Sequence, residues 1–366
     1  MKKILFTLGL GVVVVLAAAA QSRAPARGRG LTEIPGLRVG HYTIPDARTG
    51  CTVVLFDGEG AVAAISQRGA APGTRETDLL DPLNMVERIH AIVFSGGSAY
   101  GLDTAQGVMR YLEERNIGFR IAGGVVPIVP AAVIFDLPFV ANPKARPTAD
   151  CGYRAAMTAS DGPVAEGNVG VGAGATVGKI GGTFPSPAQA GRRLLPMKAG
   201  VGTIAIRLPS GLIVAAMAAV NAVGDVIDPT TGQVVAGVRD PNGSLADARK
   251  LLRSGGRTDP PQAGGNTTLA VVATNARLTK VQAGRMALMA DDGLARAINP
   301  SHTLGDGDTV FAVATGAWAG EADLTVVGAL AAEALSEAIV RAATQAQSSG
   351  GLPAARDLGT VPARFK

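Results

Sequence analysis

The stretch that decides the fold is GGNTTLAVVATN, residues 264–275. A polar lead-in, residues 253–265, runs directly into a β-branched apolar run, which predicts a buried strand. A small amide, Asn266, and two hydroxyls, Thr267 and Thr268, stand at the junction. Taken alone, these residues also fit an ordinary loop-to-strand junction.

A cut before Thr267 would create a complete catalytic unit at that junction. The new first residue would carry a hydroxyl nucleophile and a free α-amine, and the amine can take the proton from its own side chain. An α-amine has a pKa of roughly 7.7–8.0, so a useful fraction is unprotonated near neutrality. Thr267 is therefore the candidate nucleophile, and Asn266–Thr267 is the candidate autocleavage bond.

The first 20 residues predict an export signal. Residues 1–3 are a short basic region, residues 4–16 are apolar, and residues 17–20 are small, the order found in secretory signals. The apolar stretch is short for a membrane span, which favours a cleaved signal. The alternative is a membrane anchor that is retained. We therefore expect a periplasmic or secreted protein without a stable membrane partner.

The formal charge of +5 comes from the leader. Lys2 and Lys3 carry two of the positive charges, and the three arginines of residues 23–29 account for the other three. The body from Gly30 onward is close to neutral, and aromatic residues make up only 4% of the chain. A nucleic-acid partner needs a basic surface, often with aromatic side chains. The sequence therefore predicts no nucleic-acid binding.

Cys51 and Cys151 are the only two cysteines of the chain. Export would permit a disulfide, but two isolated cysteines are more often small buried residues. The sequence favours unpaired thiols and leaves pairing open.

Hairpin-like strands and interspersed helices predict stacked sheets covered by helices, in one large domain or two. Strands are expected over residues 37–42, 51–56, 61–66, 91–94, 128–135, 201–208, 212–221, 268–275 and 309–314. Helices are expected over residues 102–115, 150–160, 280–297 and 324–345. No repeat of 20–50 residues is present, which argues against a solenoid or propeller.

The glycine-rich segment 170–179 resembles a phosphate loop only superficially. Ala173 replaces a required glycine, and Ile180 stands where a Ser or Thr must reach the metal. A dinucleotide fingerprint also fails, since the preceding residues 162–168 are not a strand. We interpret the segment as a glycine loop that lines a cleft.

Histidines and serines give no strong catalytic motif. His41, His90 and His302 are far apart and lack metal-ligand spacing, so each is predicted to be structural and no metal or other cofactor is expected. Ser95 and Ser98 each lack a flanking glycine of a nucleophile elbow, which disfavours a triad hydrolase.

Polar residues that interrupt apolar sequence complete the candidate site. Asn221 ends a long apolar strand, where it is either an ordinary strand-end amide or a donor aimed at an oxyanion. Tyr153 lies in a predicted helix and on its own fits a packing role. Asp306 and Asp308 flank Gly307 just before a strand, a pattern that also fits a plain turn.

The chain resembles the DmpA-type aminopeptidases, also described as L-aminopeptidase/D-esterases and β-peptidyl aminopeptidases. The resemblance covers nearly everything from about residue 30 to 320 and rests on six motifs taken in order. They are GLRVGH at 36–41, FSGGSAYGL at 94–102, GNVG at 167–170, VNAVGDV at 220–226, NTT at 266–268 and DGD at 306–308.

This resemblance implies an α/β (α+β) fold, a four-layer αββα sandwich that the ornithine acetyltransferases share. It implies a precursor that cuts itself into an α-chain, residues 21–266, and a β-chain, residues 267–366, which form one catalytic domain. By matching positions it implies a nucleophile (Thr267), an oxyanion hole (Asn221 and the Ala222 amide), an active-site phenol (Tyr153) and groups that position the new amine (Asp306 and Asp308).

Two departures bear on the substrate. Well-known members often carry a serine nucleophile, whereas this chain has Thr267, and β-peptide-cleaving members resemble Ser-Gly-Glu where this chain has residues 306–308, Asp-Gly-Asp. The expected substrate is a small peptide, amino-acid amide or ester, and we expect a homo-oligomer of αβ units. The alternatives are an acyltransferase of the ornithine acetyltransferase type and an exported binding protein that is never cut.

Overall fold

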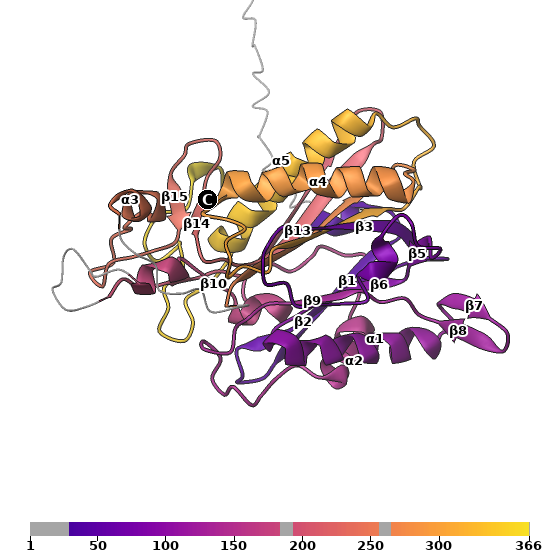
Figure 1. The fold of residues 1–366 in the computed structure, drawn as a ribbon, viewed down its shortest axis with the longest axis horizontal. Coiled ribbons are helices and arrows are strands. Elements are labelled where there is room, and N and C mark those ends of the chain that lie inside the picture. Colours follow the sequence, from indigo (N-terminus) through magenta and orange to yellow (C-terminus); the bar gives the residue numbers. More distant parts are fainter. Residues whose placement is uncertain (1–28, 184–192, 256–264, 366) are drawn as a thin grey trace, which may run out of the picture.

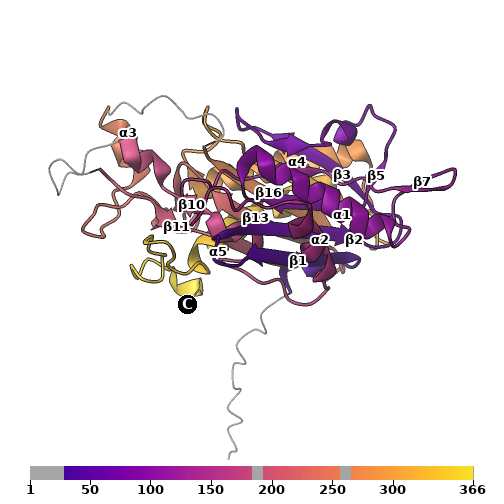
Figure 2. The ribbon, with the colours of Figure 1, turned by 90° about the horizontal axis from the view of Figure 1, so that it is seen from below.

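Two β-sheets lie face to face between two pairs of helices (Figures 1 and 2). The computed structural model describes residues 29–183, 193–255 and 265–365, so the predicted export signal and most of the lead-in before Thr267 lie outside the described residues. The order of layers is helices, six-stranded sheet, five-stranded sheet, helices. The predicted αββα sandwich is confirmed.

The six-stranded sheet is built mainly from the second half of the chain. Its strands in spatial order are β12 (Val201–Arg207), β13 (Ile213–Asn221), β16 (Thr267–Thr274), β18 (Thr309–Ala314), β3 (Ala61–Gln67) and β5 (Arg88–Ile89). Its outer face is covered by α4 (Lys280–Ala297) and α5 (Leu324–Thr344).

The five-stranded sheet comes from the first half of the chain. Its strands in spatial order are β1 (Leu37–Ile44), β2 (Thr49–Phe56), β6 (Ala91–Ser95), β9 (Ala131–Val133) and β4 (Thr74–Arg75). Its outer face is covered by α1 (Thr104–Glu113) and α2 (Ala149–Met157).

Three apolar layers hold the four structural layers together. One lies between each sheet and its helices, and a third lies between the sheets, where the rings of Phe94 and Phe311 are 5.9 Å apart. Every residue of β13 and β16 is buried. Strands covered on both faces need continuous apolar runs, and this is the pattern that the sequence shows there.

Short elements extend the sandwich at its two ends (Figure 1). They are the hairpin of β7 (Phe119–Ile121) and β8 (Gly124–Val126), the pair β10 (Thr176–Val177) and β11 (Met197–Lys198), the trio β14 (Asp225–Ile227), β15 (Val234–Ala236) and β17 (Ile298–Asn299), and α3 (Ala248–Arg253). No helix within the described part of the chain is long and apolar enough to cross a membrane.

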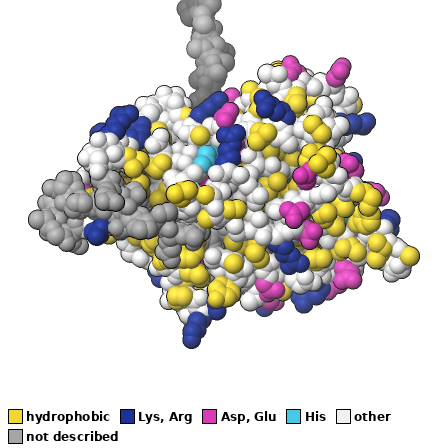
Figure 3. Space-filling model, in the orientation of Figure 1, with side chains coloured by type: hydrophobic (Ala, Val, Ile, Leu, Met, Phe, Trp, Pro, Cys, Tyr) yellow, Lys and Arg dark blue, Asp and Glu magenta, His cyan; other side chains and the backbone are white. Residues whose placement is uncertain are grey.

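Acidic and basic side chains are interspersed on the face shown in Figure 3. This distribution agrees with a body whose formal charges balance once the leader is set aside.

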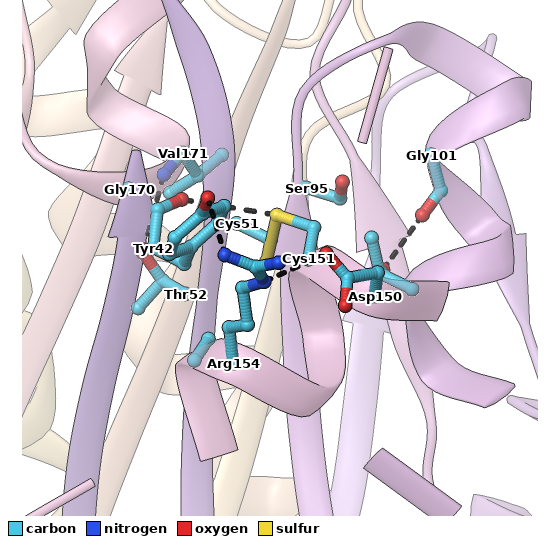
Figure 4. Close-up of a disulfide and its surroundings, with 12 residues drawn as sticks. Tyr42, Cys51, Thr52, Ser95, Gly101, Asp150, Cys151, Arg154, Gly170 and Val171 are labelled. Carbon is cyan, nitrogen blue, oxygen red and sulfur yellow. Dashed lines mark hydrogen bonds and ion pairs between the residues drawn. A yellow bond between two sulfur atoms is a disulfide. The ribbon is translucent and has the colours of Figure 1, made fainter. Parts of the chain in front are cut away.

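Cys51 and Cys151 form a disulfide, so the preference for unpaired thiols was wrong. Cys51 lies on β2 and Cys151 on α2, which packs directly on the outer face of that strand (Figure 4). The two residues are 100 positions apart in the chain. Sequence spacing carries no information about a contact of this kind, because the packing of the helix on the sheet creates it.

Candidate functional site

Thr267 is the first residue of β16 and is almost fully buried. Its Oγ1 donates a hydrogen bond to the carbonyl oxygen of Asn266, the residue before it. That same oxygen accepts a hydrogen bond of 2.8 Å from the backbone N–H of Gly307. The carbonyl of the predicted autocleavage bond is therefore held between the candidate nucleophile and a backbone donor.

The Asp306–Asp308 triplet reaches Thr267 because β16 and β18 are parallel neighbours, with Leu269 paired to Thr309. Adjacent parallel strands begin at the same edge of a sheet, so the residues just before them meet. Asp308 Oδ1 accepts a hydrogen bond of 2.7 Å from the N–H of Thr268.

Asp306 lies beside the same junction. Its Oδ2 accepts hydrogen bonds from the N–H and Oγ1 of Thr303, at 2.9 and 2.7 Å. Its Oδ1 is buried without a hydrogen-bond partner. Burial and the nearby charge of Asp308 raise the pKa of Asp306 to about 6. A buried carboxylate oxygen without a partner is a place for an added donor, such as a new amine.

Asn221 lies opposite Thr267, as its pairing partner at the end of β13. Its Oδ1 accepts hydrogen bonds from the N–H and Oγ1 of Thr176, at 3.1 and 3.3 Å, and its Nδ2 donates to the carbonyl of Phe135 at 3.1 Å. The amide oxygen and one of the two N–H groups of Nδ2 are thus engaged in the uncut chain. Ala222 follows it in the buried core.

Lys179 joins these groups, and sequence reasoning missed it. Its Nζ donates to the carbonyl oxygens of Asn221 at 2.7 Å and of Gly265 at 3.4 Å. Burial lowers its pKa to about 7, against the opposing effect of nearby carboxylates, Asp306 foremost. The available signal is the position of Lys179 at the end of the glycine-rich segment 170–179, where it resembles the lysine of a phosphate loop.

The glycine-rich segment itself is packed into the core, since every residue of Gly170–Gly174 is buried. An added Cβ at Gly174 would come within 2.3 Å of the carboxylate of Asp136. Asp136 also accepts from Thr49 Oγ1 at 2.6 Å and from Gly97 N–H at 2.8 Å. The glycines allow close packing around this carboxylate.

Tyr153 is not brought to Thr267. It lies on α2, on the outer face of the five-stranded sheet, and its hydroxyl donates to Glu114 at 2.7 Å. Its ring packs edge-on against Tyr111 and beneath Arg110. These contacts agree with a packing role for Tyr153, as its position in the sequence suggests.

His41 and His90 have the structural roles predicted for them. His41 Nδ1 lies 2.9 Å from Thr52 Oγ1, and His90 Nδ1 accepts from the N–H of Ile128 at 3.1 Å. His302 differs from them in its location, because its Nδ1 lies 3.0 Å from Asp308 Oδ2, next to the candidate site.

Replacing Gly307 with Ala is expected to slow self-cleavage. An added Cβ would lie 2.8 Å from Thr267 Oγ1 and 2.7 Å from the carbonyl oxygen of Ala71, so the hydroxyl must move. A misplacement of that kind costs roughly 10- to 100-fold in rate. The measurement is the time course of chain cleavage followed by mass spectrometry. Gly124→Ala is the control for an added methyl, since Gly124 has no positive φ and an added Cβ there meets nothing within 4 Å. Cleavage of Gly307→Ala at the wild-type rate would contradict this geometry.

Known proteins resemble this chain over most of its length. The sequence model of peptidase family S58 matches residues 29–355. An uncharacterised aminopeptidase of Mycobacterium tuberculosis is 43% identical over 356 residues, covering 90% of this chain and 97% of its own length. The 6-aminohexanoate-oligomer endohydrolase of Kocuria sp. is 30% identical over 331 residues, covering 85% of each chain.

Solved structures share the fold at low sequence identity. A β-aminopeptidase of Burkholderia sp. aligns with a TM-score of 0.66 at 22% identity, covering 92% of this chain and 93% of its own. The L-aminopeptidase D-Ala-esterase/amidase of Ochrobactrum anthropi, described as a variant of the Ntn hydrolase fold, aligns with a TM-score of 0.64 at 17% identity, covering 91% and 95%.

Proposed function

The chain belongs to peptidase family S58, a family of aminopeptidase hydrolases, and on that premise we propose that it is a self-processing threonine aminopeptidase or amidase. It cuts itself between Asn266 and Thr267 and then releases N-terminal residues from small peptides, amides or esters. The observation that carries the proposal is the Asn266 carbonyl, which both Thr267 Oγ1 and the Gly307 N–H contact.

Self-cleavage begins with attack of Thr267 Oγ on the carbonyl carbon of Asn266. The oxygen of that carbonyl becomes the oxyanion, and the Gly307 N–H donates to it. The peptide C–N bond then breaks, which leaves Asn266 joined to Thr267 Oγ as an ester. The backbone nitrogen of Thr267 takes a proton and becomes the α-amine. Lys179, with a pKa of about 7, is suited to exchange a proton beside this bond near neutrality. Water hydrolyses the ester.

Substrate hydrolysis follows the same path with the new amine as base. Thr267 Oγ attacks the amide or ester carbonyl, and the α-amine takes the hydroxyl proton and passes it to the leaving group. Asn221 Nδ2 and the Ala222 N–H supply the oxyanion donors in this proposal. Asp306, through its buried and unpartnered Oδ1, and Asp308 hold the amine. Water then releases the acyl group.

The experiment is an intact-mass spectrum of the purified protein, combined with N-terminal sequencing of the smaller fragment. We expect two chains, the smaller beginning Thr-Thr-Leu-Ala-Val, and hydrolysis of aminoacyl p-nitroanilides by the cut protein. An active protein that remains one chain, or a fragment beginning at Thr268, would refute the assignment.

A second candidate substrate is a linear amide oligomer. It is favoured by relatives named 6-aminohexanoate-oligomer endohydrolases, of which one is 30% identical to this chain. Internal cleavage of 6-aminohexanoate oligomers and release of N-terminal amino acids give different products. Product analysis with both substrates decides between the two activities.

We further propose that the protein is exported and assembles as a homo-oligomer of cut units. The support for export is the order of residues 1–20. The support for assembly is the hairpin β7–β8, which exposes the apolar side chains Phe119, Ile121 and Val126. Protein recovered from the periplasm or medium should begin near residue 21 and show a multiple of the unit mass by light scattering. A monomer with an intact Met1 in the cytoplasm would contradict both proposals.

A further inference from the structure

A cluster of charged side chains lies behind the candidate site, and we call it the His302 cluster. It consists of His302, Asp308, Asp291 and Arg68. Nδ1 of His302 lies 3.0 Å from Asp308 Oδ2, and its Nε2 lies 3.5 Å from Asp291 Oδ1. Arg68 Nε lies 3.3 Å from Asp291 Oδ2. The imidazole is thus placed between two carboxylates that are themselves buried.

Separate parts of the fold supply these residues. Asp291 comes from α4, Arg68 follows β3, and Asp308 precedes β18. His302 has a φ of +55°, in the left-handed region, where histidine is enriched among the non-glycine residues. Its placement between two buried carboxylates indicates a specific role for its ring.

Asp308 connects the cluster to the candidate nucleophile. Its Oδ1 accepts the N–H of Thr268, next to Thr267, while its Oδ2 accepts the backbone N–H of His302 at 3.0 Å. Its carbonyl oxygen accepts the N–H groups of Arg68 and Gly69 at 3.2 and 3.3 Å. Asp308 therefore links His302 to the residue next to Thr267.

We propose that His302 is a positioning residue for Asp308. Held between Asp308 and Asp291, it fixes the Asp308 side chain on the first residues of the β-chain and places a positive charge behind it, near the α-amine of Thr267. This inference rests on the proposed function, because the amine exists only after the cut.

The charges that face His302 set the sign of its effect. Burial on its own lowers the pKa of His302, but the contact with Asp308 and the charges of Asp308 and Asp291 outweigh it and raise the pKa. Arg68 opposes this rise. The charges of Asp306 and Lys179 also interact with that of Asp308 and with each other. Below its raised pKa, His302 is a cation facing the carboxylates.

The expected effect on activity follows from that charge. A cation behind Asp308 offsets the carboxylates that favour a protonated α-amine, so it lowers the pKa of the amine. Without it, the acid limb of the kcat/KM profile of the cut enzyme should move to higher pH, by about one unit, the lower end for a nearby charge. A merely structural residue would change the rate equally at every pH.

Two variants separate the charge of His302 from a neutral contact with Asp308. Asparagine tolerates the left-handed conformation, and in His302→Asn its amide places a neutral donor near the position of Nδ1. In His302→Gln the amide nitrogen instead lies near the position of Nε2. Both should show the shifted acid limb, and only His302→Asn should keep the wild-type rate at high pH, where the wild-type imidazole is neutral.

A second measurement does not depend on the cut. Because the folded pKa of His302 is raised, its stabilising contribution is complete below the unfolded pKa of about 6.5 and disappears as pH rises through the folded value. The difference in Tm between wild type and His302→Asn should therefore shrink from pH 6 to pH 9.

His90→Gln is the matched control, because burial lowers the pKa of His90 and its contribution has the opposite sign. The difference in Tm between wild type and this variant should grow as pH rises, and its pH–rate profile should not move.

The outcomes are distinct. If the protein is never cut, the proposed function is refuted. The Tm measurements can still be made on the uncut chain, and they test the contact between His302 and Asp308. If both His302 variants are cut and the acid limb of their kcat/KM profiles does not move, the inference is overturned. The proposed function is then unaffected. Should the His302 variants fail to fold, Asp291→Asn provides the test, since loss of that carboxylate lowers the pKa of His302, and the pH dependence of Tm should move to lower pH; a pH dependence of Tm that does not move overturns the inference.

Discussion

Thr267→Ala is expected to yield a single, inactive chain. The hydroxyl of Thr267 contacts the carbonyl oxygen of Asn266 and is the proposed nucleophile for both the self-cleavage and the substrate reaction. Its loss should lower hydrolysis by roughly 10⁴-fold or more, since removal of a nucleophile costs up to about 10⁶-fold in comparable hydrolases. Mass spectrometry and p-nitroanilide hydrolysis measure the two effects.

Thr267→Ser is the matched variant, because it keeps the hydroxyl and removes only the methyl group. It should still be cut, since the chemistry needs only a hydroxyl. Thr268→Val tests the neighbouring hydroxyl, and cleavage should persist in it. A cut Thr267→Ala chain, or an uncut Thr268→Val chain, would move the assignment away from Thr267.

The main layers of the fold could be predicted from sequence because their elements are long and strongly patterned. The helix expected at 280–297 and the strand expected at 309–314 have the observed bounds, and the hairpin of residues 201–221 is present as β12 and β13. Short strands such as β14 and β17 have only two or three residues. Pairing from distant parts of the chain creates them, so no local periodicity marks them.

The candidate site was only partly readable from sequence. Strand register brings three predicted residues, Asn221, Asp306 and Asp308, to Thr267 or to its neighbour. Their sequence signal is a polar residue at the end or the start of an apolar strand. Lys179 and His302 had no such marker.

The resemblance placed Tyr153 at the active site, whereas the fold places it on the outer helical layer. Helix α2 covers the five-stranded sheet, while Thr267 begins a strand of the other sheet. A resemblance that matches a residue in a helix is therefore weaker evidence for a place at the active site than strand pairing that brings the residue to Thr267.

The last prediction concerns Asn221, whose amide has two possible functions. In the uncut chain its Nδ2 donates to the carbonyl of Phe135 and its Oδ1 accepts from Thr176. As an oxyanion donor it must present Nδ2 to substrate. Asn221→Ala should then lower kcat by about 10²–10³, the usual cost of losing one such donor.

The same substitution also leaves buried groups of Thr176 and Phe135 without partners, at about 1–3 kcal/mol of unfolding free energy for each. Stability and kinetics must therefore be measured separately, on protein already shown to be cut. Thr176→Val is the control, because it removes a hydrogen bond to Oδ1 and leaves Nδ2 untouched. If Asn221→Ala and Thr176→Val lose stability while both hydrolyse substrate at the wild-type rate, Asn221 is structural. A fall in kcat confined to Asn221→Ala assigns the oxyanion donor to its amide, because only that variant lacks Nδ2.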